Sequence, residues 1–337
     1  MNIAGYDLLG NQGSEGIRYA WEIGSGTRYV ESAAFKNKTK GEESDICGYT
    51  TSVSAGCLLS AQRTQCAFCA TGNDLPFSRL LTSKEIALQN VFMVLSDLER
   101  SDHLELQTKM REFAYMGQGE PGLSYQQVRD AIEITNSAME QLGQKVYRHV
   151  FATCGIPESI EQYKQDIQYF FTQRVTLHLS VHALSERDRL MPINRIYPIE
   201  DVVNVAKEVK EISGEKPCIG VMLFRNFSKH GLIEDYTTNK NEFKAILAMI
   251  DPNLFRISLC EYNPIKNLDS ADEYPTEQMM ELVAIARRYG FETKYFTSYG
   301  REKDTACGML GGKEPECVAS AKWKRLEEKA KKMVNLF

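Results

Sequence analysis

Apolar, β-branched runs alternate with amphipathic stretches along most of the chain, a pattern typical of β–α units that build a parallel sheet. The predicted strands are 112–116, 149–153, 175–182, 219–224, 255–261 and 293–297. The predicted helices lie near 83–99, 125–141, 158–165, 199–213, 240–250 and 276–289. The first two begin at Thr82 and Ser124 with the spacing of a capping box. A further strand around 47–55 completes a barrel-like set, in which catalytic groups sit at the carboxyl ends of strands.

The two ends of the chain have a different pattern. Residues 1–46 hold short polar and β-rich pieces and predict a small strand-rich extension. Residues 319–337 are rich in lysine and predict a basic helix, either a solvated surface helix or an element that contacts RNA or another partner. We therefore divide the chain into the extension (1–46), a barrel with a C-terminal cysteine loop (47–312) and the basic C-terminal helix (313–337).

Composition limits the class of protein. The 337 residues are 43% hydrophobic, enough for one barrel-sized domain. The chain has no run of eighteen apolar residues and no basic-then-apolar start, so we expect a cytoplasmic protein without a membrane segment. Its nine cysteines then favour metal binding or thiol chemistry over disulfides. The net charge of −5 means that any nucleic-acid contact needs a local basic surface.

Three cysteines form a candidate metal site. Cys57, Cys66 and Cys69 have the spacing C-x8-C-x2-C, and three thiolates can hold an iron-sulfur cluster while one iron keeps an open position. A structural zinc site needs four ligands, and no second C-x-x-C exists. His178 and His182 lie in a predicted strand, where residues four apart are separated by about 13 Å, too far to share a metal. Zinc and unligated core cysteines remain alternatives.

A lone cysteine near the C-terminus, Cys307, follows an acidic residue and precedes a glycine in the string Asp304–Gly308. Such a thiol could be presented to the ligand of the open iron. The two cysteine strings together indicate radical chemistry.

Eight strings, in order and at similar separations, resemble the RlmN/Cfr family of radical S-adenosylmethionine (SAM) enzymes, which methylate adenine in ribosomal RNA. They are Thr27–Ser32, Ser54–Cys57, Cys66–Gly72, Met116–Pro121, Leu179–Ala183, Met191–Asn194, Tyr262–Pro264 and Asp304–Gly308. The resemblance implies a partial parallel (β/α)6 barrel of the radical SAM type. It also implies a 4Fe-4S cluster on the three cysteines, SAM as cofactor, an external electron donor and an RNA substrate; we expect a monomer.

The resemblance assigns roles to three further residues. Cys307 would accept a methyl group from one SAM, and a radical formed from a second SAM would abstract hydrogen from that S-methyl group. The methylene radical then adds to an sp2 carbon, because an adenine carbon of this kind is not nucleophilic. Cys47 would release the resulting covalent adduct, and Glu31 would remove the proton from the substrate carbon.

The resemblance also implies a SAM pocket. Gly119 and Glu120 lie in a Gly-x-Gly-Glu-Pro turn, where the backbone can approach a ligand and the carboxylate can bind the SAM ammonium group. The other expected pocket residues are Thr153, Ser180, His182 and Asn263. Ser180 and His182 are two apart in the predicted strand and should share a face.

Three departures from the family limit the substrate assignment. The gap between Cys57 and Cys66 is longer than the family's, and Ala152 and Cys154 stand where serines are expected. Only 46 residues precede Cys47, so we expect the family's helical RNA-binding domain to be absent or much reduced. The alternatives are the same methylation of a peptide or small molecule and a non-catalytic iron-sulfur or zinc protein.

Overall fold

The computed structural model describes residues 1–10, 16–24, 29–39, 42–100, 109–224, 240–263, 265, 276–296, 303 and 308–336. The described strands are β1 (Asn2–Leu9), β2 (Gly16–Glu22), β3 (Tyr29–Thr39), β4 (Glu42–Thr50), β5 (Ser54–Ala55), β6 (Arg79–Leu80), β7 (Met110–Tyr115), β8 (Val146–Thr153), β9 (Val175–Ser180), β10 (Cys218–Leu223), β11 (Arg256–Glu261), β12 (Thr293–Phe296) and β13 (Cys317–Val318).

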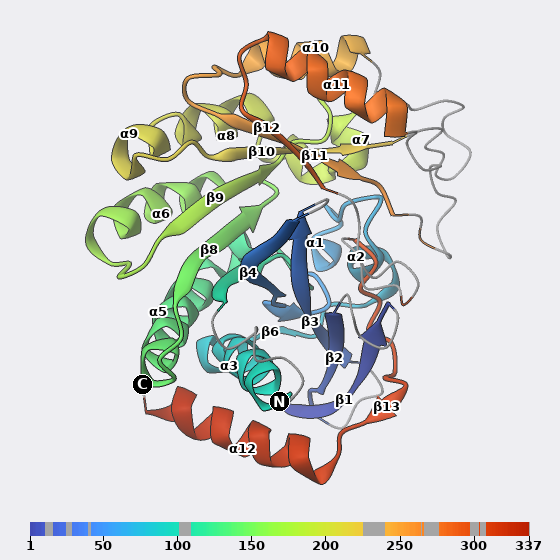
Figure 1. The fold of residues 1–337 in the computed structure, drawn as a ribbon. Helices are drawn as coiled ribbons and strands as arrows, with labels where there is room; N and C mark the ends of the chain where they lie inside the picture. Colours follow the sequence, from blue (N-terminus) through green and yellow to red (C-terminus); the bar gives the residue numbers. More distant parts are fainter. Residues whose placement is uncertain are drawn as a thin grey trace.

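The described helices cover the sheet and the ends of its strands (Figure 1). They are α1 (Leu58–Ala61), α2 (Ala70–Asp74), α3 (Ser83–Glu99), α5 (Tyr125–Gln141), α6 (Pro157–Tyr169), α7 (Arg187–Leu190), α8 (Ile199–Ala206), α9 (Val209–Ser213), α10 (Lys240–Met249), α11 (Thr276–Arg288) and α12 (Ala321–Asn335). Two 3-10 turns, η2 (Pro121–Ser124) and η3 (Pro192–Arg195), precede α5 and α8.

One large sheet organises the described chain. Its strand order is β12-β11-β10-β9-β8-β7-β4-β3-β2-β1-β13. The neighbours from β4 to β12 are parallel, whereas those from β4 to β13 are antiparallel. The predicted fold class is confirmed: a mixed α/β fold with a large, mostly parallel sheet and a strand-rich N-terminal region.

The N-terminal strands continue the same sheet. β4 runs across the boundary predicted between residues 46 and 47 and pairs with β3 on one side and β7 on the other. The division into three parts stays a prediction. Because β3 pairs with β4, the face of β3 that carries Glu31 is part of the site described below.

The two predicted capping boxes have different outcomes. At α3 the Thr82 hydroxyl accepts a hydrogen bond from the Glu85 N–H at 3.2 Å, and the Glu85 carboxylate accepts one from the Thr82 N–H at 3.0 Å. The box predicted at Ser124 is wrong. The 3-10 turn η2 precedes α5 and leaves Ser124 with ψ 30°, outside the extended geometry of a cap, and its hydroxyl donates to the Glu120 carbonyl instead.

The buried apolar side chains form two clusters. The larger lies between the sheet and its outer helices, where strand residues of one face meet α3, α5, α8, α10 and α11. The smaller contains Cys57 and Phe68 of the loop after β5, together with Cys154, Phe224 and Tyr262, which directly follow β8, β10 and β11. This second cluster is where such folds position reactive groups.

The predicted basic helix is present as α12, which closes the bottom of the molecule as drawn in Figure 1. Its Trp323 ring stacks on Tyr6 of β1 with centroids 4.1 Å apart and meets Phe92 of α3 at 5.7 Å. Among the helices that the structure describes, none has the length and apolar character needed to cross a bilayer.

Candidate active site

The three cysteines of the C-x8-C-x2-C motif lie together in the loop that follows β5. Cys57 directly precedes α1 and Cys69 directly precedes α2, with Cys66 between them. The Asn73 side-chain amide donates to the backbone carbonyls of Cys66 at 2.8 Å and Cys69 at 2.6 Å, which ties the C-x-x-C turn to α2. The folded chain thus gathers the predicted metal ligands.

Burial and mutual proximity disfavour the thiolate forms of these cysteines. Burial, with the neighbouring Cys69 thiol, raises the pKa of Cys57 to about 12. Burial, with Cys69 and Cys57, likewise raises the pKa of Cys66 well above its ordinary value. Three thiols so placed lose their protons together only when positive charge enters among them. Iron ions supply such charge, so this donor set fits a cluster.

The described residues offer no site for a single metal ion. Within the described ranges, no three side chains of His, Cys, Asp or Glu are close enough to hold one ion. A zinc ion binds each sulfur at about 2.3 Å, so its ligands must crowd around one centre. An iron-sulfur cluster instead distributes its cysteines over separate irons, so no single ion has to contact all three.

Aromatic rings line the side of the motif that faces the barrel. The Phe68 ring, inside the C-x-x-C turn, lies 5.2 Å from the His182 ring and 5.2 Å from the Phe224 ring, centroid to centroid. Phe224 in turn meets Tyr262 at 5.2 Å. The rings of His182, Phe224 and Tyr262 follow the carboxyl ends of β9, β10 and β11. They shield the cysteine loop from water on that side.

His182 reaches this wall by a different route from the one predicted. The strand predicted over 175–182 ends at Ser180, and His182 lies beyond it with φ 61°, so the expected shared face does not exist. The reason is that the N–H groups of Val181 and His182 both bond to the Gly220 carbonyl, which bends the chain. His182 Nδ1 accepts from the Met222 N–H at 3.0 Å, and burial lowers the pKa of His182 to about 3.

The turn after β7 requires glycine at residue 119. Gly119 has φ +99°, and a Cβ atom there would lie 2.1 Å from the Ser54 hydroxyl. A side chain is therefore excluded both by backbone conformation and by space. The turn lies directly against the segment that leads to Cys57.

Glu120 connects this turn to the end of β8. Its carboxylate accepts hydrogen bonds from the Gly122 N–H at 2.8 Å, the Cys154 N–H at 2.9 Å and the Thr153 hydroxyl. Burial raises the pKa of Glu120, while these three donors oppose the shift. The structure thus brings the predicted pocket residues Glu120 and Thr153 into direct contact.

The remaining predicted pocket residues lie at the same edge of the sheet. Ser180 ends β9, and buried Asn263 follows β11 by two residues. Because parallel strands end at one edge, these residues stand with Glu120 and Thr153 around the carboxyl ends of the strands. The roles of all four stay predictions.

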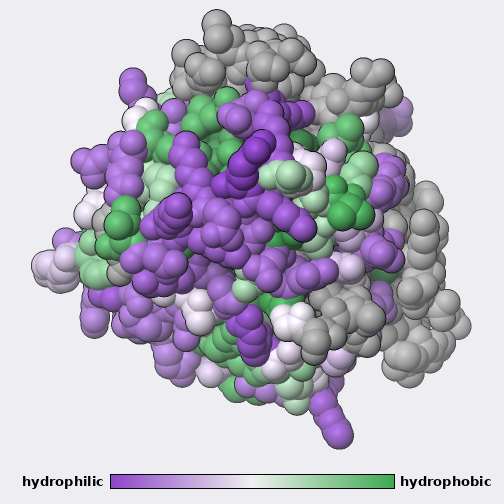
Figure 2. Space-filling model, turned by 90° about the horizontal axis from the view of Figure 1, so that it is seen from below, coloured by the Kyte–Doolittle hydropathy of each residue, from purple (hydrophilic) through white to green (hydrophobic). Residues whose placement is uncertain are grey.

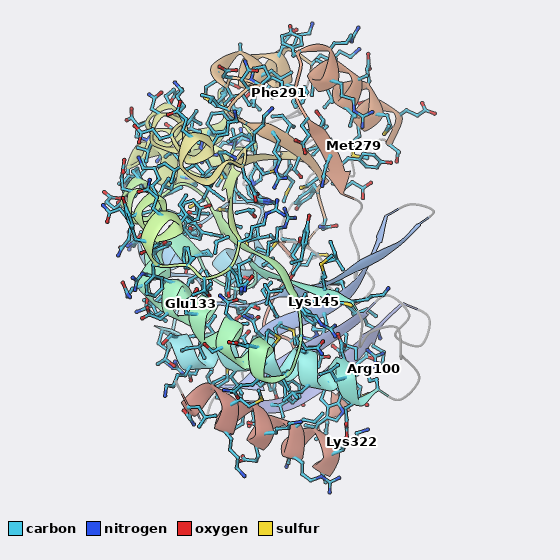
Figure 3. The ribbon with its side chains drawn as sticks, turned by 60° about the vertical axis from the view of Figure 1, so that its left-hand side comes forward. Arg100, Glu133, Lys145, Met279, Phe291 and Lys322 are labelled. Carbon is cyan, nitrogen blue, oxygen red and sulfur yellow. The ribbon has the colours of Figure 1, made fainter. Side chains whose placement is uncertain are left out.

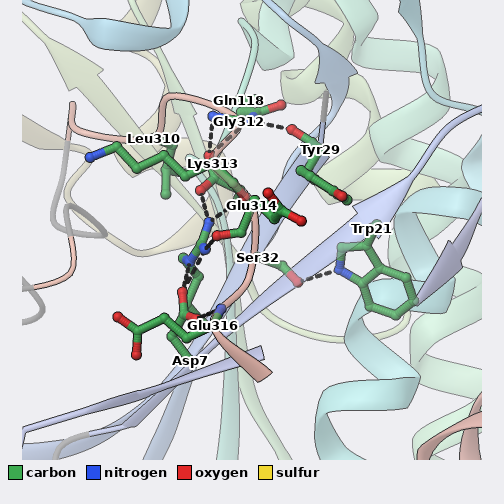
Figure 4. A network of polar contacts seen from close by, with 12 residues as sticks. Asp7, Trp21, Tyr29, Ser32, Gln118, Leu310, Gly312, Lys313, Glu314 and Glu316 are labelled. Carbon is green, nitrogen blue, oxygen red and sulfur yellow. Dashed lines mark hydrogen bonds and ion pairs between the residues drawn. The ribbon is translucent and has the colours of Figure 1, made fainter. Parts of the chain in front are cut away.

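Glu31 belongs to a buried ionic network that the sequence did not indicate (Figure 4). The Arg18 guanidinium on β2 lies between Asp7 on β1, at 2.5 Å, and Glu31 on β3. All three side chains are at most 3% exposed. Burial favours the protonated form of Glu31 and raises its pKa, whereas Arg18 favours the carboxylate. Asp7 also accepts a hydrogen bond from the Glu316 N–H at 2.6 Å.

The same network holds the backbone that follows the C-terminal cysteine loop. Arg18 donates to the carbonyls of Lys313 and Glu314, each at 3.1 Å. Glu31 accepts from the Gly312 N–H at 2.7 Å. Every one of these contacts uses the backbone of the segment 312–316, so the network positions that segment irrespective of its side chains.

Gln118 extends the network toward the turn that contains Gly119 and Glu120. Its amide nitrogen donates to Glu31 at 3.0 Å and to the Tyr29 carbonyl at 3.1 Å. Its amide oxygen is buried and has no hydrogen-bond partner among the described residues. A buried oxygen of this kind can accept a hydrogen bond from a bound molecule.

Cys307 lies outside the described residues, but Gly308, the next residue, is described. The Gly308 carbonyl accepts a hydrogen bond from the Ala70 N–H at 2.8 Å, and the Thr71 hydroxyl donates to the Leu310 carbonyl at 2.7 Å. Ala70 directly follows Cys69. The chain therefore carries the residue after Cys307 to the three-cysteine loop.

The structure does not bring Cys47 to this site. Its side chain is 2% exposed and belongs to the large apolar cluster between the sheet and the outer helices. Burial, together with the Asp97 carboxylate near the end of α3, raises the pKa of Cys47. A core thiol with this pKa is a poor nucleophile.

Strand register explains the position of Cys47. Ala33 of β3 is paired with Thr50 of β4, and Glu31 lies two residues before Ala33 on the same face. Cys47 is three residues before Thr50, an odd number, so its side chain points to the opposite face. The face of β4 that Glu31 shares carries Thr50. The releasing role of Cys47 stays a prediction.

Two residues of this region escaped the sequence analysis. Arg187 is fully buried and donates to the carbonyls of Ser180 at 2.9 Å and Cys154 at 2.8 Å. Burial lowers its pKa to about 10. Cys154, which the sequence marked only as a departure from the family, lies in the small cluster with its thiol near Cys66 and Glu120. No local pattern marks Arg187, since a charged residue in a short helix normally faces solvent.

Comparison with known proteins agrees with this geometry. No family model matches the chain. A probable dual-specificity RNA methyltransferase RlmN from Thermosipho melanesiensis is 27% identical over 295 residues, covering 87% of this chain and 75% of the relative. The ribosomal RNA large subunit methyltransferase Cfr from Staphylococcus warneri is 28% identical over 312 residues, covering 90% and 79%. The resemblance to the RlmN and Cfr methyltransferases is confirmed.

The fold has a solved counterpart. The crystal structure of a radical SAM methyltransferase from Sphaerobacter thermophilus matches with a TM-score of 0.76 and 20% identity, covering 93% of this chain and 82% of that one. At this identity the match concerns the fold. It agrees with the mostly parallel sheet and the strand-rich N-terminal region that the sequence pattern predicted.

Proposed function

We propose that this protein is a radical SAM enzyme that methylates an sp2 carbon of adenosine in ribosomal or transfer RNA by way of a methylated Cys307. The relatives named RlmN and Cfr support the reaction class and the substrate. The observation that carries the proposal is the hydrogen bond between Gly308 and Ala70, which ties the residue after Cys307 to the three-cysteine loop.

Cys57, Cys66 and Cys69 would hold a 4Fe-4S cluster, since they share one loop and leave one iron without a protein ligand. When bound, the cluster and SAM supply the one-electron chemistry that an unreactive adenine carbon requires. Phe68 and the aromatic wall behind it exclude water from that region. Within the described residues, the positive charge of Arg187 lies near Cys66 and favours the thiolate form.

Glu120 would bind the ammonium group of SAM. Its carboxylate accepts three hydrogen bonds within the protein and can accept a further one from the ammonium group. Gly119 allows the backbone of the same turn to approach the cofactor. Thr153, Ser180, His182 and Asn263 would line the rest of the pocket, since all four lie at the carboxyl ends of β8, β9 and β11. The chain's contribution is to orient the reactants.

The Cys307 thiol would first lose its proton, and the thiolate would then attack the methyl group of one SAM. The new carbon–sulfur bond forms as the methyl–sulfonium bond breaks, and S-adenosylhomocysteine leaves. We also propose that Glu31 is the base that deprotonates the substrate carbon. It lies on the barrel-facing side of β3, beside the segment that follows Cys307. Gln118 can assist, because its buried amide oxygen has no partner in the described part of the chain.

RNA and an external electron donor are the partners that this reaction requires. We propose that the protein meets them in the cytoplasm and acts as a monomer.

The test is anaerobic reconstitution with iron and sulfide, followed by SAM. We expect the broad visible absorption of an iron-sulfur cluster, and mass spectrometry should find one added methyl group on the peptide that contains Cys307. The variant Cys66→Ala should lose both signals. Cys218→Ala, which removes a buried thiol on β10, is the matched control and should keep both. A cluster without methylation at Cys307 would refute the proposal.

A further inference from the structure

The outer face of α12 carries a row of unpaired positive charges. Among its fifteen residues are six cations and two carboxylates, in a chain whose net charge is −5. Lys331 is paired with Glu327 at 2.7 Å, and Lys322 donates to the Glu99 carbonyl at 3.3 Å. The other four cations are exposed and make no ion pair with any described residue. They are Lys324, Arg325, Lys329 and Lys332, called here the α12 stripe.

The stripe surrounds a hollow on the surface. The four cations and Glu328 line an open cavity of ≈ 430 Å³. Lys324 and Lys332 are eight residues apart, so the row is about 12 Å long at 1.5 Å per residue. Figure 2, which looks at the molecule from the side of α12, shows a continuous hydrophilic band across this face. Four like charges in one row repel one another unless a negative partner is present.

The opposite face of α12 is already in use. Trp323 stacks on Tyr6, and Ala330, Met333 and Val334 are buried in the main core. At its start, Lys322 reaches the end of α3 beside Arg100 (Figure 3). The helix therefore cannot turn its apolar side toward a lipid surface, as membrane-binding amphipathic helices do.

The stripe also lacks what a protein partner requires. From Lys324 to Lys332, every exposed residue is a lysine, an arginine or a glutamate. Protein interfaces bury an apolar or aromatic centre and are depleted of lysine. A surface that binds a nucleic-acid backbone needs no apolar centre. Each nucleotide carries a phosphate, and solvated cations that contact these phosphates release the counterions bound to them.

We infer that the α12 stripe binds the phosphate backbone of the RNA substrate. This inference rests on the proposed function and adds the surface that holds the substrate. The described segment 308–319 runs directly from the cysteine loop to α12, so RNA on the stripe lies at the end of the segment that follows Cys307 (Figure 1). The contacts position the RNA and do not select its sequence.

The experiment compares two variants with the same loss of charge. In the first, all four stripe residues are replaced: Lys324→Gln, Arg325→Gln, Lys329→Gln and Lys332→Gln. In the control, four exposed cations at the other end of the sheet are replaced: Lys244→Gln, Arg287→Gln, Arg288→Gln and Lys294→Gln. The probe is a synthetic adenosine-containing RNA stem-loop, and its Kd is measured over a range of salt concentrations.

We expect the stripe variant to bind the stem-loop at least about tenfold more weakly than the unmodified protein at low salt. Its slope of log Kd against log salt should be shallower by about 3, since each lost phosphate contact removes about 0.7 to 0.9. The control variant should keep the original slope. Equal effects in the two variants would mean that only net charge matters, and the inference would be wrong.

Two further measurements separate this inference from the proposed function. SAM-dependent methylation of Cys307 without RNA should be the same in the unmodified protein and in both variants. If Cys307 is never methylated, the proposed function fails while the RNA-binding result stands. If the stripe variant keeps its RNA affinity but loses binding to polyglutamate, the partner is an acidic protein, and the inference is overturned.

Discussion

The Ala70 N–H donates a hydrogen bond to the Gly308 carbonyl at 2.8 Å, across 238 residues of sequence. Ala70 follows the last cysteine of the C-x-x-C turn, and Gly308 follows Cys307. The proposed chemistry requires the two cysteine strings to lie close together, and this backbone hydrogen bond joins them. The segment after Gly308 is then held by Thr71, Glu31 and Arg18 in turn.

The buried ionic network should control the position of this segment. Arg18→Gln leaves the carboxylates of Asp7 and Glu31 buried without their partner, and we expect a loss of about 3–5 kcal/mol in the free energy of unfolding. Urea denaturation measures this loss. Methylation of Cys307 at saturating SAM should slow more than tenfold in protein that is still folded, because displacement by about 1 Å can cost 100-fold.

Arg18→Lys tests whether charge or geometry matters. Lysine keeps the charge but cannot form the forked contacts to two carbonyls, so we expect stability to recover in part while methylation stays slow. Arg174→Gln breaks an exposed ion pair with Glu215 and is the control, with an expected cost below about 1 kcal/mol. Full recovery of methylation in Arg18→Lys would contradict a positioning role.

Cys47 should behave as a core residue. We expect Cys47→Ala to lower the free energy of unfolding by about 1 kcal/mol, because it removes a buried sulfur from the main core. It should leave turnover unchanged and trap no covalent complex with RNA, as judged by denaturing electrophoresis. A stable protein–RNA adduct in this variant would restore the releasing role that the sequence suggested.

Glu120 should determine SAM affinity. We expect Glu120→Gln to weaken SAM binding at least about tenfold in the reconstituted protein, because an amide cannot pair with an ammonium group as a carboxylate does. Equilibrium dialysis with labelled SAM measures the change. Glu112→Gln, on the same strand but paired with Arg148, is the matched control and should bind SAM normally. Similar affinity in both variants would exclude the assigned contact.

His149 should make the protein less stable in acid. Burial lowers the pKa of His149 to about 3 from 6.5, and the ring is held neutral between Tyr115 and Asn136. Below pH 6.5 the unfolded chain binds a proton that the folded chain does not, so stability falls as the pH drops. The expected slope from this residue is about 1.4 kcal/mol per pH unit between 6.5 and about 3.

His149→Gln should remove that part of the pH dependence. Urea denaturation at a series of pH values gives the comparison, and above pH 6.5 the two proteins should have parallel profiles. An unchanged slope between pH 6 and pH 4 would show that His149 does not titrate as expected.

Most of the secondary structure followed from local patterns. The helices 83–99 and 125–141 were predicted with their exact bounds, because apolar periodicity and the ends of amphipathic stretches are local signals. The strand expected over 175–182 was two residues too long, since its end depends on hydrogen bonds to Gly220, about forty residues away. The spacing of Cys57, Cys66 and Cys69 likewise sufficed to predict one loop.

The sequence by itself determined the alternation of strands and helices, the cysteine motif and the basic helix, because each is a repeat or spacing within a few tens of residues. Only the tertiary structure decided that Cys47 points away from Glu31, and that Asp7, Arg18 and Glu31 hold the segment after Cys307. The face of a strand reverses with a shift of one residue in register. Register and buried ion pairs arise from contacts between distant strands, and no local pattern records them.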